Sequence, residues 1–216
     1  MGGQVDFDEV ARLQQPPTDR RPLLLVGAVD VATGAHQAFS SWRGEITLNA
    51  IVASAAVPPL FRAVDADGRL YWDGLFTTNP PVREFTDLPE RPDEIWVVQI
   101  NPQRRDKEPR TMQEIVDRRN ELSGNLSLGQ ELYFVDKINQ LLESHSALGT
   151  RYQRIAIRIV ELGAGALDYS SKLDRSSALI ESLMETGRQR ADWFFDERSQ
   201  WPRAETAPAA SVRPSR

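Results

Sequence analysis

Cysteine is absent from the 216-residue sequence, and histidine is nearly so. Without cysteine the chain has no disulfide framework, no thiol nucleophile and no cysteine-based zinc site. The two histidines, His36 and His145, lie far apart and have no carboxylate near them in a metal-ligand pattern. We interpret both as surface or strand-edge residues, and we expect no metal and no organic cofactor.

Long hydrophobic runs and a strong charge of either sign are also missing. The longest apolar run, Leu23–Val29, is too short to span a bilayer and is not placed as a signal peptide, so we expect a cytoplasmic protein. The net charge of −5 gives no electrostatic reason to expect nucleic-acid binding. The length suits one domain with a sizeable core.

Three common catalytic or phosphate-binding motifs are absent from the sequence. No serine is bracketed as G-x-S-x-G, there is no phosphate-cradling G-x-x-x-x-G-K-[ST] loop, and there is no G-x-G-x-x-G. Ser127 lies near glycines, but Leu126 and Leu128 flank it. A nucleophile elbow requires small residues there. We therefore interpret Ser127 as a cap or turn residue between two helices.

Apolar strands alternate with amphipathic helices along the rest of the chain. Residues 22–31 and 93–100 read as apolar strands, which we expect to be inner neighbours in one sheet. Helical spacing covers residues 46–56, 111–122, 126–148 and 176–195, and shorter strands are predicted at 36–41, 69–73 and 155–159. Thr111 and Glu114 have the spacing of a capping box.

This order predicts an α/β fold with a largely parallel sheet flanked by helices. We assign residues 1–21 to an N-terminal segment and residues 22–197 to one domain. Residues 198–216 are rich in Pro, Ala and Arg, and we expect a disordered tail there.

The stretch "YWDG" places Asp73 between two aromatic residues and a glycine. Asp-Gly is among the commonest turn pairs, so alone it indicates only a turn. It follows "ASAAVPPLF" (residues 53–61) and precedes "NPPV" (79–82), and a D-x-x-T-G begins at Asp30. Together these segments resemble the patatin-like phospholipases of bacterial type. The resemblance extends through "DEIWVVQINP" to residue 197 and corresponds to the C-terminal portion of the family domain.

The resemblance implies a lipid acyl hydrolase that cleaves esters with a Ser-Asp dyad, and it places the catalytic aspartate on Asp73. The family's serine and glycine-rich oxyanion loop have no counterpart in this sequence, and Leu75 departs from the family's DG[GA] motif. We therefore expect this chain to be inactive alone. We expect burial beside Trp72 and Phe76 to raise the pKa of Asp73.

Two interpretations stay open: a truncated hydrolase, which we favour, and a non-catalytic remnant or interaction domain that keeps the fold. The partners expected are a lipid or other ester substrate, peripheral membrane contact, and another copy bound through an exposed sheet edge. The head group and acyl-chain length of the substrate are not determined by these residues.

Overall fold

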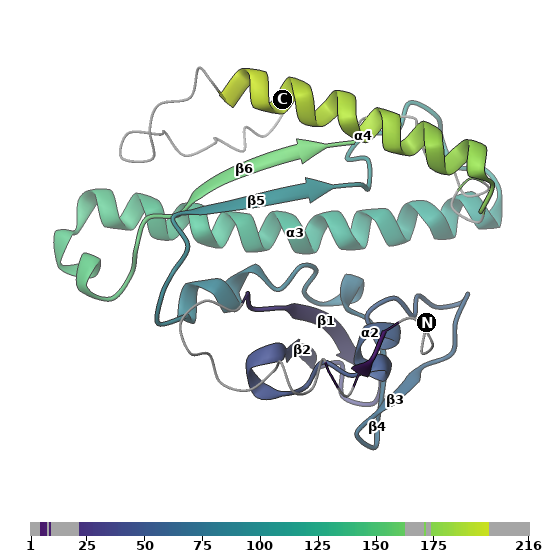
Figure 1. Ribbon diagram of the computed structural model, residues 1–216, viewed down its shortest axis with the longest axis horizontal. Coiled ribbons are helices and arrows are strands. Elements are labelled where there is room, and N and C mark those ends of the chain that lie inside the picture. The colour runs from purple at the N-terminus through teal and green to yellow at the C-terminus, as the bar shows by residue number, and fades with distance from the viewer. Residues whose placement is uncertain (1–4, 8, 10–21, 163–170, 172–173, 199–216) are drawn as a thin grey trace. The chain divides into compact units, whose positions relative to one another are not determined.

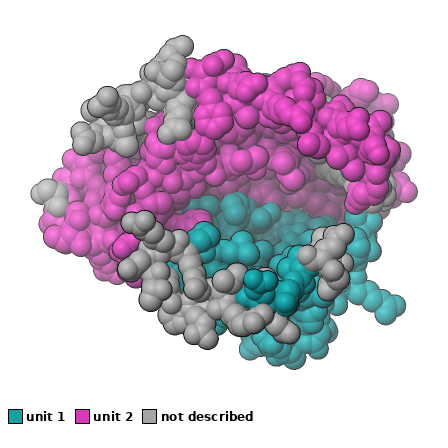
Figure 2. Space-filling model, in the orientation of Figure 1, with its two compact units in different colours: residues 1–82 teal, residues 83–216 magenta. Residues whose placement is uncertain are grey.

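The computed structural model describes residues 5–7, 9, 22–162, 171 and 174–198. The chain divides into two compact units, residues 1–82 and 83–216, coloured separately in Figure 2. The short helix predicted at residues 6–15 lies largely outside the described residues. The tail predicted to be disordered begins at residue 198, and residues 199–216 also lie outside them.

A four-stranded antiparallel sheet forms the first unit, in the order β2-β1-β4-β3. The strands are β1 (Leu25–Asp30), β2 (His36–Ser40), β3 (Val64–Ala66) and β4 (Arg69–Asp73). Helix α2 (Leu48–Ala53) packs on the sheet, and Thr47 caps it by accepting from the Ala50 N–H at 3.1 Å. The buried cluster contains Ala28, Phe39, Ile46, Ala50, Ala53, Ala66 and Tyr71.

The second unit contains a parallel strand pair and two long helices. β5 (Glu94–Gln99) pairs with β6 (Ala156–Glu161), and the pair lies between α3 (Met112–Ser144) and α4 (Ser177–Arg198) (Figure 1). On the α4 side the Trp96 ring meets the rings of Phe194 and Phe195, with centroids 5.4 and 5.8 Å away. The helix predicted at residues 176–195 is present as α4, and its least exposed residues include Leu179, Leu183, Gly187, Ala191 and Phe194.

Within the residues that the structure describes, four short 3-10 helices connect these elements. They are η1 (Ser41–Arg43), η2 (Gly74–Phe76), η3 (Val82–Asp87) and η4 (Ser146–Thr150). None of the helices in the described part of the chain is both long and apolar enough to cross a membrane.

The mixed α/β class is confirmed, whereas the largely parallel sheet is not. Among the described residues only β5 and β6 run parallel, and the other pairings are antiparallel. The two apolar strands are not neighbours either, because β1 pairs with β2 and β4 while β5 pairs with β6. An apolar run shows that a strand is covered, but the identity of its neighbours depends on connections that the run does not encode.

Strand β1 has partners on both edges, as its apolar sequence predicts. Within the described residues, the strands with one strand partner are β2, β3, β5 and β6. Val98 and Ile100, at and just beyond the end of β5, are 73% and 59% exposed. β1 therefore offers no open edge, and the expected contact through a sheet edge stays a prediction.

Residues 111–148 were predicted as two helices, but α3 is continuous from Met112 to Ser144. Ser127 is therefore buried in the middle of a helix, and its assignment to a cap or turn is wrong. Glycine weakens a helix by about 1 kcal/mol relative to alanine. Gly124 and Gly129 do not end this one, because its long buried side is fixed by tertiary contacts.

Candidate functional site

Asp73 is the last residue of β4, as predicted, and three backbone contacts fix its position. Asp73 is the strand partner of Ala28 in β1, and the Asp73 N–H donates to the carbonyl oxygen of Ala56 at 3.1 Å. Ala56 belongs to the "ASAAVPPLF" segment, so that segment and "YWDG" meet in space. The Leu75 N–H donates to Asp73 Oδ1 at 2.9 Å, which makes Asp73 the N-cap of η2.

The turn after Asp73 depends on close contact between two glycine backbones. A Cβ added at Gly74 would lie 2.9 Å from the carbonyl carbon of Gly27 and 3.1 Å from the N of Ala28. A Cβ added at Gly27 would lie 3.0 Å from the carbonyl oxygen of Thr78. Glycine is needed at both positions because backbone, not a flexible side chain, occupies the space. This contact holds the Asp73 turn against β1.

Burial raises the pKa of Asp73 to about 6, against the opposing effect of the hydrogen bond from the Leu75 N–H. That one hydrogen bond reaches Oδ1, and no described residue donates to Oδ2. A carboxylate with a pKa near neutrality and an open oxygen is suited to accept and return a proton.

The aromatic residues next to Asp73 in the sequence contribute less to its burial than their adjacency predicts. Successive side chains of a strand leave opposite faces of the sheet, so Trp72 points away from the face that carries Asp73. Phe76 is 38% exposed. The raised pKa of Asp73 is thus as expected, but its burial arises from the packing of the unit and not from Trp72 beside it in sequence.

A second buried carboxylate, Asp30, lies at the other end of the sheet, where β1 ends. Its Oδ1 accepts from the N–H groups of Ala32 and Thr33, both at 2.9 Å, and closes the turn containing Gly34 at φ 70°. The pKa of Asp30 is lowered, chiefly by the hydrogen bond from the Thr33 N–H. Asp30 therefore stays ionised and acts as a turn anchor, which explains the D-x-x-T-G pattern structurally.

Buried charges in the second unit form a structural network. Arg105 donates to Glu121 at 2.6 and 2.9 Å and to Asp117 at 2.5 Å. Arg118 reaches Glu121 at 3.1 Å and also donates to the carbonyl oxygen of Pro102 at 3.1 Å. Glu121 is 1% exposed, so the network ties the loop after β5 to α3. Sequence reasoning missed it, since that loop reads as a charged, exposed one.

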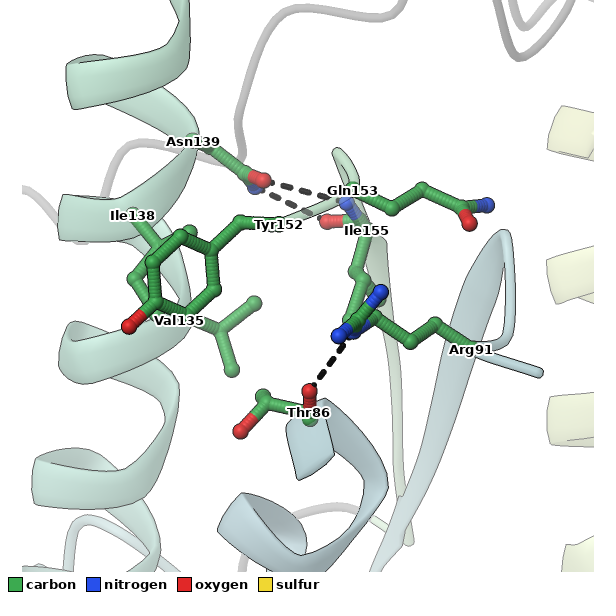
Figure 3. Close-up of a pocket in the computed structure, with 8 residues that line it drawn as sticks. All are labelled: Thr86, Arg91, Val135, Ile138, Asn139, Tyr152, Gln153 and Ile155. Atoms are coloured by element: carbon green, nitrogen blue, oxygen red, sulfur yellow. Dashed lines mark hydrogen bonds between the residues drawn. The ribbon is translucent and has the colours of Figure 1, made fainter. Parts of the chain in front are cut away.

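The enclosed pocket between α3 and β6 is too small for a ligand (Figure 3). Its cavity of about 10 Å³ is at the lower limit for one water molecule. Asn139 donates to the carbonyl oxygen of Ile155 at 2.8 Å and accepts from its N–H at 3.0 Å. Arg91 donates to the carbonyl oxygen of Thr86 at 2.8 Å. The Asn139 contacts anchor the chain that enters β6, and the Arg91 contact holds the chain that leads to β5.

The first unit thus carries a candidate acid–base carboxylate at a strand end, of the class used in hydrolases. In the comparison with family models, residues 7–86 match the patatin-like phospholipase model. The match includes Asp73 and ends before β5, so the resemblance to the patatin-like phospholipases is confirmed up to residue 86. The comparison with curated proteins gave no match.

Proposed function

We propose that Asp73 is the general base of a Ser-Asp dyad in a lipid acyl hydrolase that cleaves phospholipid or neutral glycerolipid esters. The observation that carries this proposal is the pKa of Asp73, raised to about 6 by burial, within the residues that match the patatin-like family. The serine and the oxyanion donors are not in this sequence, which has no G-x-S-x-G. Lipid ester is the proposed substrate, and contact with the membrane is peripheral.

In the proposed reaction Asp73 takes the serine proton as the serine oxygen attacks the ester carbonyl. It then returns that proton to the departing alcohol oxygen, and water releases the acyl group by the same exchange. A free aspartate, with a pKa of about 3.9, is a weak base at neutral pH. A pKa near 6 strengthens the base and still leaves it ionised above that pH. Its open Oδ2 is the oxygen available to the serine hydroxyl.

The first test uses the chain as it stands. Hydrolysis of a nitrophenyl ester and labelling by a fluorophosphonate serine probe are both expected at background. Reading the in-frame DNA before Met1 then separates the two interpretations. A glycine-rich loop followed by G-x-S-x-G supports the hydrolase, and a stop codon supports the non-catalytic alternative.

The second test joins that upstream sequence to the chain. Asp73→Asn is expected to lower kcat/KM by about 10²- to 10⁴-fold, since it keeps the acceptor for Leu75 and removes the base. In the parent, kcat/KM is expected to rise with pH through about 6. The exposed Asp65, Asp67 and Asp87, each changed to Asn, are controls with little expected effect. Turnover of Asp73→Asn within about threefold of the parent would exclude the dyad.

A further inference from the structure

Helix α3 carries an exposed apolar stripe on the side opposite its buried face. Ile115, Leu122, Leu126 and Tyr133 are 44%, 49%, 64% and 58% exposed. At 100° per residue all four fall within a narrow strip along the helix. The buried face, in contrast, contains many polar residues: Asp117, Glu121, Asn125, Ser127, Glu131 and Asn139. The buried face also contains Leu128, Leu132 and Val135, so α3 has apolar side chains on both sides, unlike an ordinary surface helix, whose exposed side is polar.

The stripe follows the spacing of a helix–helix seam. Positions at alternating steps of three and four residues run from Ile115 to Gln140, and they include Arg119, Leu122, Leu126, Gly129, Tyr133 and Asp136. In the middle lies an open depression of about 470 Å³, bordered by Leu122, Leu126, Gly129 and Tyr133. A Cβ added at Gly129 would meet nothing within 4 Å. The seam therefore has protruding side chains beside a hollow.

We propose that this stripe binds α3 of a second copy of the chain, in antiparallel orientation. One register gives the three central pairs of seam positions complementary partners, and its outermost pair is Ile115 with Gln140 of the second copy. Leu126 faces Gly129 of the second copy and fills the depression, and Leu122 faces the second copy's Tyr133. Arg119 faces Asp136 of the second copy. Each contact occurs twice, as twofold symmetry requires of an interface between identical surfaces.

Charge and shape favour a second copy over a lipid surface. The face carries both signs, Arg119 and Lys137 on one side and Asp136 on the other, and the register pairs opposite charges. A net charge of −5 opposes adsorption to an anionic membrane. The depression at Gly129 lies beside Leu126 and can be filled by a leucine of fixed position on a second copy, whereas fluid lipid tails do not require such a depression. The stripe and Asp73 belong to different units of the chain, and the proposal uses no observation on Asp73.

The test is sedimentation equilibrium of the full chain over a range of concentrations, and a reversible monomer–dimer equilibrium is expected. Gly129→Leu should raise the dimer dissociation constant by about tenfold or more, because it fills the depression twice per dimer. The monomer has open space at this position and a better helix former, so its circular dichroism should be unchanged. Phe134→Ala, 48% exposed on α3 but off the stripe, is the matched control and should dimerise normally.

Charge reversal tests the register. Arg119→Asp and Asp136→Arg should each weaken the dimer, and the double variant Arg119→Asp/Asp136→Arg should restore it. The proposal is overturned if the double variant is no tighter than the single ones, or if Gly129→Leu dimerises like the parent. Loss of the dimer in Val98→Lys, at the unpaired edge of β5, would instead assign the contact to that sheet edge. A monomer at every concentration that floats with phosphatidylcholine vesicles would assign the stripe to lipid.

Discussion

Two aspartates on one sheet have opposite protonation behaviour because their immediate surroundings differ. Asp30 accepts two backbone N–H groups, which favour its charged form and lower its pKa. Asp73 accepts one, and burial outweighs it, so its pKa rises to about 6. Divergence of this kind is how a fold separates a structural carboxylate from one that can exchange a proton.

The glycine contact beneath Asp73 gives a residue-scale prediction. Gly74→Ala should destabilise the fold by about 1–3 kcal/mol, because the added Cβ meets the backbone of Gly27. As the turn moves away from β1 it should become more hydrated, so the pKa of Asp73 should fall from about 6 towards its ordinary value. Urea unfolding and carboxyl-carbon NMR titration measure the two effects.

Gly187→Ala is the matched control for that substitution. Gly187 lies within α4, where an added Cβ meets nothing within 4 Å, so alanine should stabilise the helix by about 0.5–1 kcal/mol. The Asp73 titration should not move in this variant. A Gly74→Ala protein with unchanged stability and an unchanged Asp73 titration would show that the glycine contact does not position the turn.

Sequence alone could find Asp73 and the end of its strand, but not the cause of its pKa. The motif spacing and the short apolar strand before it located the residue. Its burial depends on neighbours from β1 and the end of α2, which are distant in sequence. Adjacency in the chain predicts that Trp72 helps to bury Asp73, whereas strand alternation directs the Trp72 side chain to the opposite face of the sheet.

At the element scale, helix starts were easier to predict than helix continuity. The capping box is present as expected: Thr111 Oγ1 accepts from the Glu114 N–H at 3.2 Å, and Glu114 Oε2 accepts from the Thr111 N–H at 2.9 Å. Capping is local and has a sequence signature. The continuity of α3 through its glycines rests on buried partners such as Arg105, which the local sequence does not reveal.

Removal of the α3 cap should weaken the helix start. Thr111→Ala is expected to cost about 1 kcal/mol of unfolding free energy. It should raise the lowered pKa of Glu114 only in part, because the backbone N–H of residue 111, the largest cause of the lowering, is kept and only the side-chain hydrogen bond is lost. Denaturant unfolding and NMR titration check both. The control, Thr186→Ala, removes a mid-helix hydroxyl that donates to the Ser182 carbonyl and should change stability little. Equal losses in the two variants would argue against a specific capping effect.

The buried network of α3 gives a larger expected effect. Glu121→Gln should destabilise the protein by about 3 kcal/mol, because Arg105 and Arg118 lose the negative charge between them. Glu143→Gln breaks a pair with Arg154 in which Glu143 is 60% exposed, and it should cost about 1 kcal/mol or less. Thermal or urea unfolding compares them. A Glu121→Gln loss no larger than that of Glu143→Gln would mean that the network contributes little.

At the scale of the whole molecule, the sequence predicted the class and missed the topology. Most of the predicted strands and helices are present, because hydrophobic periodicity is a local signal. Strand pairing, in contrast, is not a local signal. The Leu25–Asp30 run is as apolar as an inner strand of a parallel sheet, yet it pairs antiparallel with both of its neighbours. Its antiparallel neighbour β2 follows a short turn, but β4 returns after α2 and β3, and that long-range choice has no signature in the strand itself.

The two carboxylates also shape how the stability of the whole protein depends on pH. The folded-state pKa of Asp73 is raised, so the folded protein binds its proton more tightly than the unfolded chain does. The stability that comes from neutral Asp73 is complete below about pH 4 and is lost as pH rises through about 6. Asp30 acts in the opposite direction: its pKa is lowered, so its contribution is present above the unfolded value and is lost in acid.

Asp73→Asn should therefore stabilise the protein at neutral pH, even though it removes the proposed base. Asparagine resembles the protonated aspartate and still accepts from Leu75. The gain in the free energy of unfolding should be near zero at pH 4 and should grow between pH 4 and about pH 6. Above about pH 6 it should level off on the order of 2 kcal/mol. Urea unfolding of both proteins at several pH values gives the difference curve, with Asp65→Asn, an exposed site on β3, as the flat control. A gain that is constant with pH, or a loss at pH 8, would mean that Asp73 is not a buried carboxylate held against its own ionisation.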